Sequence, residues 1–220
     1  SYVFTGWYSD KSLTNRVTSV KLTESMTVYA GWSIANLPFT DVSKNDWFHD
    51  DIRYVYENGL MNGISSTQFA PYGSTTRGMI VTILYRMEGQ PAVSRDCPFA
   101  DVASGSYYER AITWAAANGI VTGHSSTIFA PDANITREQL AAILYRYAIY
   151  KGLDVSVGES TNILSFEDFA SLSEYAIPAM QWACGAGVLY GFGGSLLPDA
   201  PANRLQAAAI LHRFCVNILN

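Results

Sequence analysis

The sequence has few charged residues, few cysteines and no long apolar run. Lys, Arg, Asp and Glu make up 15% of the 220 residues and hydrophobic residues 49%, which is typical of a globular protein and excludes a disordered chain. The net charge of -5 argues against a general nucleic-acid binder, because such proteins usually carry a basic face. The best apolar stretches are interrupted by Arg86, Arg146 and Arg213, so no membrane insertion is expected.

The few cysteines and histidines exclude several kinds of site. Cys97, Cys184 and Cys215 are odd in number, so they cannot form a fully paired disulfide framework, and their spacing fits no zinc motif. Cys184 and Cys215 lie in helix-like apolar stretches, which predicts buried free thiols. The sequence shows no convincing carboxylate pair, serine elbow or phosphate loop. We therefore expect no catalysis, no metal site and no cofactor in this chain.

Residues 1–33 differ in pattern from the rest. Tyr2–Phe4, Val17–Val20 and Met26–Tyr29 are rich in β-prone residues and are separated by polar turn residues, which predicts strands. Residues 34–38 are interpreted as a linker. The chain opens at Ser1 without a methionine, inside a strand-like pattern, so it is interpreted as a fragment from which a leader could have been removed.

One unit occurs three times in the remaining sequence. Each copy opens on a phenylalanine followed two residues later by an aspartate, and an arginine lies 38 residues after this phenylalanine in every copy. Such a period indicates one supersecondary unit that buries its apolar face against its neighbours. The repeated positions are the phenylalanines Phe39, Phe99 and Phe166, the helix-ending glycines Gly59, Gly119 and Gly187, the turn glycines Gly63, Gly123 and Gly191, the prolines Pro71, Pro131 and Pro198, and the arginines Arg77, Arg137 and Arg204.

Each copy is expected to fold as helix, loop and helix, with room for a short strand in the loop. Apolar residues recur at helical spacing, and the helix-ending glycines suit the left-handed conformation at a helix C-terminus. The second helix opens on a capping residue in each copy, and two copies add a glutamine that completes a capping box. The capping pairs are Thr136 with Gln139 and Asn203 with Gln206, whereas Thr76 with Met79 keeps only the cap.

Six arginines form two repeated columns on the second helices. The first column is Arg77, Arg137 and Arg204, and the second is Arg86, Arg146 and Arg213, nine residues later. Nine residues rotate a helix by about 900°, so the columns face opposite sides. The second column is interpreted as solvated charge, since a cation near a helix C-terminus is favoured by the helix dipole.

The first column faces the unfavourable end of the dipole, at a cost of a few tenths of a kcal/mol. A bound anion would reverse this effect, because a helix N-terminus offers free N–H groups and an arginine adds a bidentate fork for a carboxylate. Alternatively, the arginines pair within the fold with Asp41, Asp101 or Asp168. Both interpretations stay open. Aromatic residues near the first helix, Trp47 and Tyr107, are candidates for stacking on sugars, whereas Trp182 lies inside an apolar run and is more typical of core.

The three copies resemble S-layer homology repeats. The second copy carries the resemblance most fully, in Phe99–Val102, the pair Tyr107–Tyr108, the turn Asn118–Gly123 and the helix start Ile135–Glu138. The resemblance covers residues 38–220, which divide into repeats at 38–94, 95–155 and 156–220. It implies a mainly α fold in which three helix-loop-helix repeats form a pseudo-threefold spindle with grooves between lobes, here preceded by a small β segment.

The resemblance also implies a function. Such repeats anchor surface proteins non-covalently to the bacterial cell wall, by binding secondary cell-wall polysaccharides that often carry pyruvate ketals, outside the cell in the wall or S-layer. The alternative is a structural or protein-interaction module that self-associates in a surface lattice. The candidate glycan-binding residues are Arg77, Arg137, Arg204, Thr76, Thr136, Asp41, Asp101, Trp47, Tyr107, Gly63 and Gly123.

The sequence departs from the family pattern in two places, and residues 1–33 show a second resemblance. Met79, Gln139 and Gln206 replace the glutamate of the family's helix start, and the loop Gly191–Gly194 of the third copy is unusual, so the third groove is expected to be the weakest. Residues 1–33 resemble the second half of a Listeria–Bacteroides (internalin B-type) repeat, through Phe4, Gly6–Tyr8 and Val28–Trp32. That resemblance implies a partial β-grasp-type surface spacer.

Overall fold

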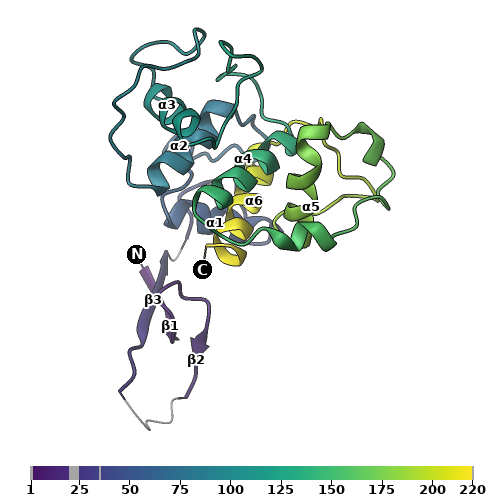
Figure 1. Cartoon of the computed structure of the whole chain (residues 1–220). Helices are drawn as coiled ribbons and strands as arrows, with labels where there is room; N and C mark the ends of the chain where they lie inside the picture. Colours follow the sequence, from purple (N-terminus) through teal and green to yellow (C-terminus); the bar gives the residue numbers. More distant parts are fainter. Residues whose placement is uncertain (1, 20–24, 35, 220) are drawn as a thin grey trace.

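A small antiparallel sheet and a larger helical body make up the computed structural model, which describes residues 2–19, 25–34 and 36–219 (Figure 1). The sheet consists of β1 (Tyr2–Tyr8), β2 (Arg16–Val17) and β3 (Tyr29–Ile34) in the order β2-β1-β3. It projects from one side of the helical body, close to both chain ends (Figure 1).

The strand boundaries correct two sequence predictions. The stretch predicted at Val17–Val20 is a strand only at Arg16–Val17, with Val20 outside the described residues. The third strand begins at Tyr29, not Met26, and it includes Ile34, which was assigned to the linker. The reason is pairing: β1 ends at Tyr8, opposite Tyr29, so the residues before Tyr29 have no part of β1 to pair with.

Each repeat contributes two helices, which confirms the helix-loop-helix prediction. Isolated bridges, rather than strands, occur in the three intervening loops, so the short strand that the loop could have held is not formed. Short 3-10 turns at Ser156–Ser160, Phe169–Ser171 and Glu174–Ala176 lead into the third pair of helices. The helices are α1 (His49–Glu57) and α2 (Arg77–Met87), α3 (Glu109–Ala117) and α4 (Arg137–Tyr150), and α5 (Ile177–Gly185) and α6 (Arg204–Asn217).

The helix ends follow local sequence rules. Thr76 accepts a hydrogen bond from the Met79 N–H, and capping boxes form in the other two repeats, as predicted. Gly59, Gly119 and Gly187 adopt φ of 66°, 69° and 66°, the left-handed conformation that glycine adopts without steric cost. Within the described residues, no helix combines the length and hydropathy that a bilayer-spanning segment needs.

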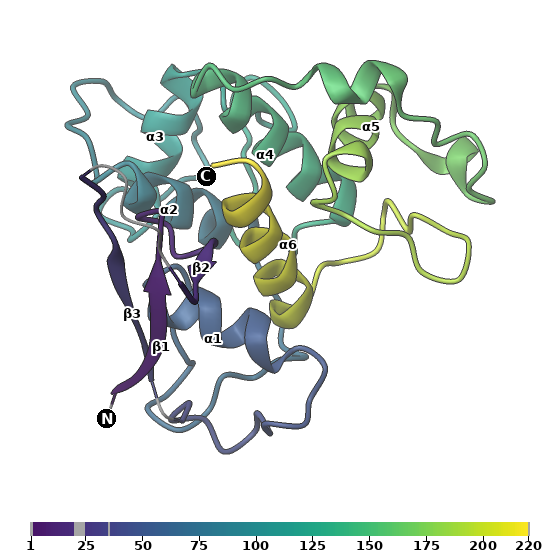
Figure 2. The same cartoon turned by 90° about the horizontal axis from the view of Figure 1, so that it is seen from below.

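The three repeats pack in a cycle. The first helix of each repeat packs against the second helix of the repeat before it, so α3 packs on α2 and α5 on α4. The cycle closes where α1 packs on α6, as Figure 2 shows. Trp182 is fully buried next to Phe214, which confirms that it belongs to the core. The cysteines are free thiols as predicted, although only Cys215 is buried and Cys184 is half-buried.

The main chain repeats the same cycle where the second helices begin. The N–H groups of Arg77 and Gly78 donate to the carbonyls of Ala133 and Pro131 in the next repeat. The first two N–H groups of α4 donate in the same way to the third repeat, and those of α6 to the first. The expectation that these helix N-termini offer free N–H groups to an anion is therefore wrong, because neighbouring loops already occupy them.

The first arginine column lies inside these junctions. Arg77, Arg137 and Arg204 are only 5%, 6% and 8% exposed. The Nε of Arg77 donates to the Phe129 carbonyl at 2.9 Å and its Nη2 to the Thr122 carbonyl at 3.3 Å. Burial lowers the pKa of all three guanidinium groups. The equivalent acceptors are the carbonyls of Leu196 and Tyr190 for Arg137, and of Phe69 and Asn62 for Arg204.

The repeated aspartates bond to the same loop segment from its other side. Asp101 accepts from the N–H groups of Phe129 and Ala130 at 2.8 and 2.6 Å. The peptide group between Phe129 and Ala130 therefore lies between a cation and an anion, with its carbonyl on Arg77 and its N–H on Asp101. Asp41 and Asp168 bond in the same way. In the described part of the chain, these arginines and aspartates meet through a peptide group and not as direct ion pairs.

This peptide group also carries backbone strain. Ala70, Ala130 and Leu197 have φ of 57°, 57° and 54°, in a region that costs a non-glycine residue about 1–2 kcal/mol. The two charged side chains orient the peptide group and maintain this conformation. Each loop is therefore shaped by an aspartate of its own repeat and an arginine of the preceding one.

Replacing Arg77 with methionine should destabilise the protein strongly. The change removes two charge-assisted hydrogen bonds and leaves two carbonyls without their donor, so we expect the free energy of unfolding to fall by about 3 kcal/mol or more. Arg86→Met, at an exposed position of the same helix, should cost about 0.5 kcal/mol or less. Urea unfolding followed by circular dichroism measures both, and equal losses would contradict the structural role of Arg77.

Asp101 should contribute to acid sensitivity. Partial desolvation raises the pKa of its carboxyl, but hydrogen bonds from Phe129 and Ala130 outweigh this effect and the net pKa is lowered. A lowered pKa stabilises the fold above the ordinary aspartate value of about 4, and this contribution is lost as the pH falls through the folded-state pKa. Between pH 5 and pH 3, Tm should therefore fall less steeply in Asp101→Asn than in the wild type. The exposed-site control Asp199→Asn should behave like the wild type in calorimetry.

Candidate functional site

Each junction between repeats is hollowed into a groove that three repeats build together. One repeat supplies a buried first-column arginine at the base, and the next supplies its turn loop and second helix. The repeat after that supplies residues from just before its first helix and, around Arg137, also Tyr72 of its loop. Arg77 and Arg86, on the same helix, line different grooves, which confirms that the columns face opposite sides. We name the grooves after their basal arginines as the Arg77, Arg137 and Arg204 grooves.

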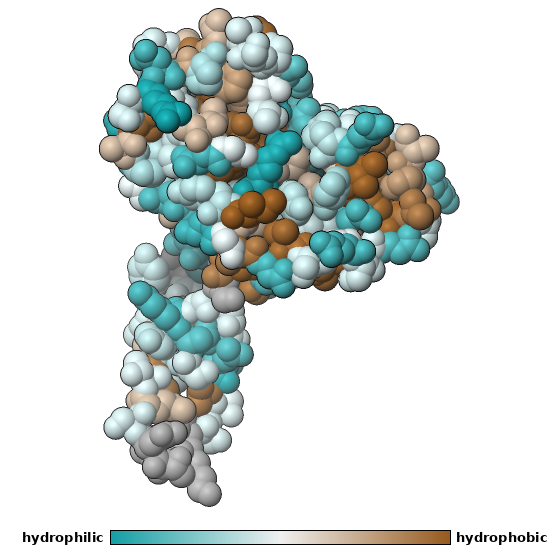
Figure 3. Space-filling model, in the orientation of Figure 1, coloured by the Kyte–Doolittle hydropathy of each residue, from teal (hydrophilic) through white to brown (hydrophobic). Residues whose placement is uncertain are grey.

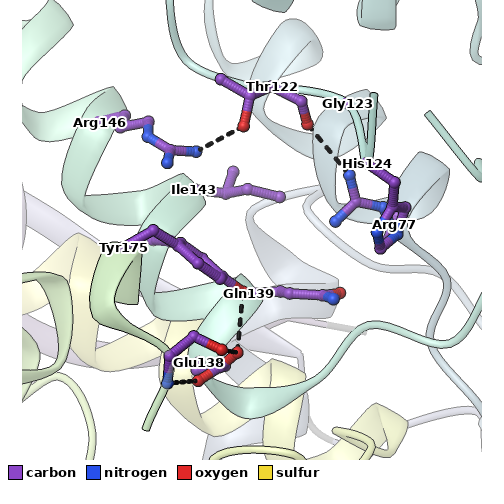
Figure 4. A pocket seen from close by; sticks show the side chains of 11 residues that line it. Arg77, Thr122, Gly123, His124, Glu138, Gln139, Ile143, Arg146 and Tyr175 are labelled. Carbon is purple, nitrogen blue, oxygen red and sulfur yellow. Dashed lines mark hydrogen bonds between the residues drawn. The ribbon is translucent and has the colours of Figure 1, made fainter. Parts of the chain in front are cut away.

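The Arg77 groove is the most polar of the three, with a volume of about 500 Å3 (Figure 4). Arg77 and His124 lie at one side, and Arg146 reaches in from α4 with its Nη1 3.5 Å from the Thr122 hydroxyl. Burial lowers the pKa of Arg77, and the charge of Arg146 lowers it further. The lining residues are Arg77, Thr122, Gly123, His124, Glu138, Gln139, Ala142, Ile143, Arg146, Ser173 and Tyr175.

Glu138 is the carboxylate of this groove, and it is committed to structure. It is 3% exposed and accepts hydrogen bonds from the Ser173 N–H, the Ser173 hydroxyl and the Tyr175 hydroxyl. Burial and the bond to Glu138 raise the pKa of the Tyr175 hydroxyl. The carboxylate therefore fastens the third repeat to α4, and its charge is already stabilised by three donors. The groove presents mainly cationic groups to a ligand.

The Arg204 groove is smaller and mainly apolar. Its volume is about 270 Å3, and Met79 takes the place that Gln139 has on α4. Tyr107, 60% exposed, flanks it from the second repeat, and Arg86 lines it from α2. The other lining residues are Leu60, Met61, Asn62, Thr75, Thr82, Ile83 and Arg204.

The Arg137 groove is aromatic. Its volume is about 350 Å3, and the exposed rings of Trp47, Tyr72, Tyr190 and Phe192 line it. The Arg213 guanidinium carbon lies 4.7 Å from the centre of the Tyr190 ring, in a cation–π contact. Trp47 of the first repeat therefore belongs to the same groove as Arg137 of the second.

The structure separates the candidate residues into two groups. Trp47, Tyr107 and Gly123 line grooves, and the first-column arginines lie at the bases. Thr76 and Thr136 cap their helices instead, and Asp41 and Asp101 lie behind the loops that they hold. Gly63 packs against Phe39, next to the lining residue Asn62.

The second arginine column was missed as a candidate. Arg86, Arg146 and Arg213 were interpreted as solvated charge, yet each lines a groove opposite a first-column arginine of the preceding repeat. The sequence places the two columns on opposite helix faces, and they meet at each junction only when the repeats close into a ring. What was missing was the closure of the ring.

The turn glycines are required by packing. A Cβ added to Gly123 would lie 2.6 Å from Cε1 of Phe99 and would also clash with the carbonyls of Ser125 and Ile128. Gly63 and Gly191 meet Phe39 and Phe166 in the same way. The phenylalanine that opens each repeat thus packs directly under the turn that lines the groove.

Gly123→Ala should displace the loop of the Arg77 groove. Two of the opposing atoms are main-chain carbonyl oxygens that cannot rotate away, so we expect a loss of about 3 kcal/mol in the free energy of unfolding. Ser126→Ala, an exposed change in the same loop, is the matched control and should cost little. Thermal unfolding compares the two variants, and a Gly123→Ala protein as stable as the control would show that the loop is not tightly packed.

The chain is similar to proteins of bacterial surfaces. The model of the S-layer homology domain matches residues 38–78, 98–141 and 165–208, which together make up more than half of the chain. An endoglucanase of Bacillus sp. (strain KSM-635) is 35% identical over 79% of this chain and 18% of its own length. The surface-layer 125 kDa protein of Lysinibacillus sphaericus is 34% identical over 49% of this chain and 10% of its own. The S-layer protein sap of Bacillus anthracis is 26% identical over 80% of this chain and 21% of its own.

These matches agree with the geometry. Each matched range lies within one of the three repeats and spans its first helix, its turn loop and the start of its second helix. The matched region corresponds to only a small part of these relatives. The similarity to S-layer proteins indicates a cell-surface, wall-associated location. The chain belongs to the S-layer homology domain family.

Proposed function

We propose that this chain anchors a surface protein non-covalently to the cell wall by binding an acidic secondary cell-wall polysaccharide in its inter-repeat grooves. Membership of a family that binds cell-wall polymers supports wall anchoring. The observation that carries the acidic ligand is the Arg77 groove, where Arg77, Arg146 and His124 gather in a polar cavity of about 500 Å3.

Charge is the reason why an acidic sugar fits this groove. Arg77 is desolvated, and its pKa is lowered by burial and by the positive charge of Arg146. A carboxylate between them would stabilise both cations, and a charge-assisted hydrogen bond contributes about 1.5–3 kcal/mol. A pyruvate ketal would present such a carboxylate on a sugar ring. We assign the direct contact to Arg146, because two nitrogens of Arg77 already donate to loop carbonyls.

The remaining candidate residues take different parts in this proposal. Trp47 and Tyr107 stack on sugar rings, and Arg137 and Arg204 supply the positive base of their grooves. Thr76 and Thr136 cap their helices, and the loops are held in shape by Asp41, Asp101, Gly63 and Gly123. The cyclic helix contacts support a pseudo-threefold spindle for the helical body, on which several weak grooves would bind a repetitive polymer with avidity. Residues 1–33 serve as a partial β-grasp-type spacer in front of this body.

A second candidate function is self-association in a surface lattice. The sheet exposes a cluster of aromatic rings, Phe4, Trp7 and Trp32, which are 43%, 50% and 57% exposed, and the Phe4 ring makes edge contacts with both tryptophans. Hydrophobic residues also show in patches over the helical body (Figure 3). Solution size measured with and without wall polymer separates the two functions, because a lattice module associates without polymer.

We propose no catalysis for the chain itself. Among the described residues, no three metal-ligating side chains come together, and the buried carboxylate Glu138 is fully engaged. The endoglucanase relative is more than five times longer than the matched region, so an enzymatic activity of such a protein would lie elsewhere in it.

Arg146→Ala should weaken binding to the wall polymer without unfolding the protein. Arg146 is half-exposed, and its one described hydrogen bond is long at 3.5 Å. Loss of one charge-assisted contact predicts a tenfold to hundredfold weaker Kd, since about 1.4 kcal/mol is tenfold. Isothermal titration with purified native polymer measures this, and Arg95→Ala, at an exposed position outside the grooves, controls for net charge. Equal affinities of the two variants would refute the proposed contact.

A further inference from the structure

The residue that follows each turn glycine differs between the three repeats. Ile64, His124 and Phe192 all donate their main-chain N–H across the turn, to the carbonyls of Gln68, Ile128 and Ser195 at 2.8–2.9 Å. The turn is one residue shorter in the third repeat, and of these three side chains His124 and Phe192 line a groove. One is aliphatic, one is an imidazole and one is an aromatic ring, so the loops offer three different chemistries.

In the Arg137 groove this position is part of a larger aromatic surface. Phe192 is 79% exposed and Tyr190 57% exposed on the loop of the third repeat. Trp47 and Tyr72, 72% and 75% exposed, line the same groove from the first repeat. Single exposed aromatics are common on protein surfaces, but four that line one groove of about 350 Å3 mark a binding site.

Both arginines of this groove make contacts within the protein. The Nε and Nη2 of Arg137 donate to the carbonyls of Leu196 and Tyr190, and the Arg213 guanidinium is stacked on Tyr190. None of the described residues that line the groove is acidic. Gln206 uses its Oε1 for the capping box, which leaves its amide nitrogen able to donate to a ligand hydroxyl.

We propose that the Arg137 groove binds an uncharged pyranose unit of the wall polysaccharide, by stacking the C–H face of the sugar on its aromatic rings. This inference rests on the proposed function and deepens it. The Arg77 groove takes the acidic unit, and the Arg137 groove takes a neutral unit of the same polymer. A pyranose suits the site because it combines an apolar face for rings such as Phe192 with hydroxyls for an amide such as Gln206. The unusual third loop is thus a specialised one, not a degenerate one.

Chemical reduction of the polymer separates the two grooves. Carbodiimide activation and borohydride turn the carboxylates of the purified polymer into alcohols and leave its pyranose rings intact. We expect the wild-type chain to retain binding to this carboxyl-reduced polymer. The double variant Tyr72→Ala/Phe192→Ala, which changes two highly exposed side chains, should bind the reduced polymer at least tenfold more weakly. Tyr2→Ala, an equally exposed tyrosine on the sheet, is the matched control.

Tryptophan fluorescence gives an independent readout of the same groove. Trp47 is exposed in it, so reduced polymer should change the emission of the wild type, and this change should be lost in Trp47→Phe. Binding of the reduced polymer by the double variant as tightly as by Tyr2→Ala would overturn the inference. So would a dimeric wild type that becomes monomeric in the double variant, because the groove would then be a contact between copies.

Different results would contradict the proposed acidic recognition and the inferred stacking site. A chain that binds native polymer but not the reduced one retains acidic recognition and has no neutral stacking site, which overturns only this inference. A chain that binds both polymers equally, with the same dependence on Phe192, retains the stacking site and contradicts acidic recognition. Binding of neither polymer would overturn both.

Discussion

A peptide group held between an arginine and an aspartate is the interaction on which the other features of this structure depend. At Phe129–Ala130, the carbonyl accepts from Arg77 of the preceding repeat and the N–H donates to Asp101 of its own repeat. The same arrangement stabilises a left-handed alanine, shapes the turn loop and joins two repeats. Because it occurs three times in cyclic order, it closes the chain into a ring. The buried charges are tolerable because each has hydrogen-bonding partners.

The ring explains why structural and binding roles are close together. A first-column arginine lies at the base of each groove, while a second-column arginine on the following repeat faces the ligand space. The first maintains the loop and contributes positive charge from below, and the second is free of the main-chain bonds that occupy the first. Under the proposed function, loss of a first-column arginine lowers stability and binding together, whereas loss of a second-column arginine lowers chiefly binding. No single repeat contains a complete groove.

The three junctions share their repeated residues, but their grooves present different surfaces. Glycines without room for a Cβ begin all three turns, and the next residue, together with an aromatic from another repeat, differs between junctions. The polar Arg77 groove, the apolar Arg204 groove and the aromatic Arg137 groove thus arise from few substitutions. Under the proposed function, such a set suits a polymer that carries both acidic and neutral sugars, because each groove then binds a different part of the ligand.

Local patterns in the sequence determined the repeat, the helices, the caps at Thr76 and Thr136, and the opposite faces of the two arginine columns. These features depend on residues within a few positions of one another, so they can be predicted from spacing alone. The tertiary structure decided what the arginines contact, because the carbonyls bound by Arg204 lie 135 and 142 residues away in the first repeat. It also decided that loop carbonyls occupy the helix N-termini and that the second arginine column faces the grooves. Both features follow from closure of the ring, which no local spacing encodes.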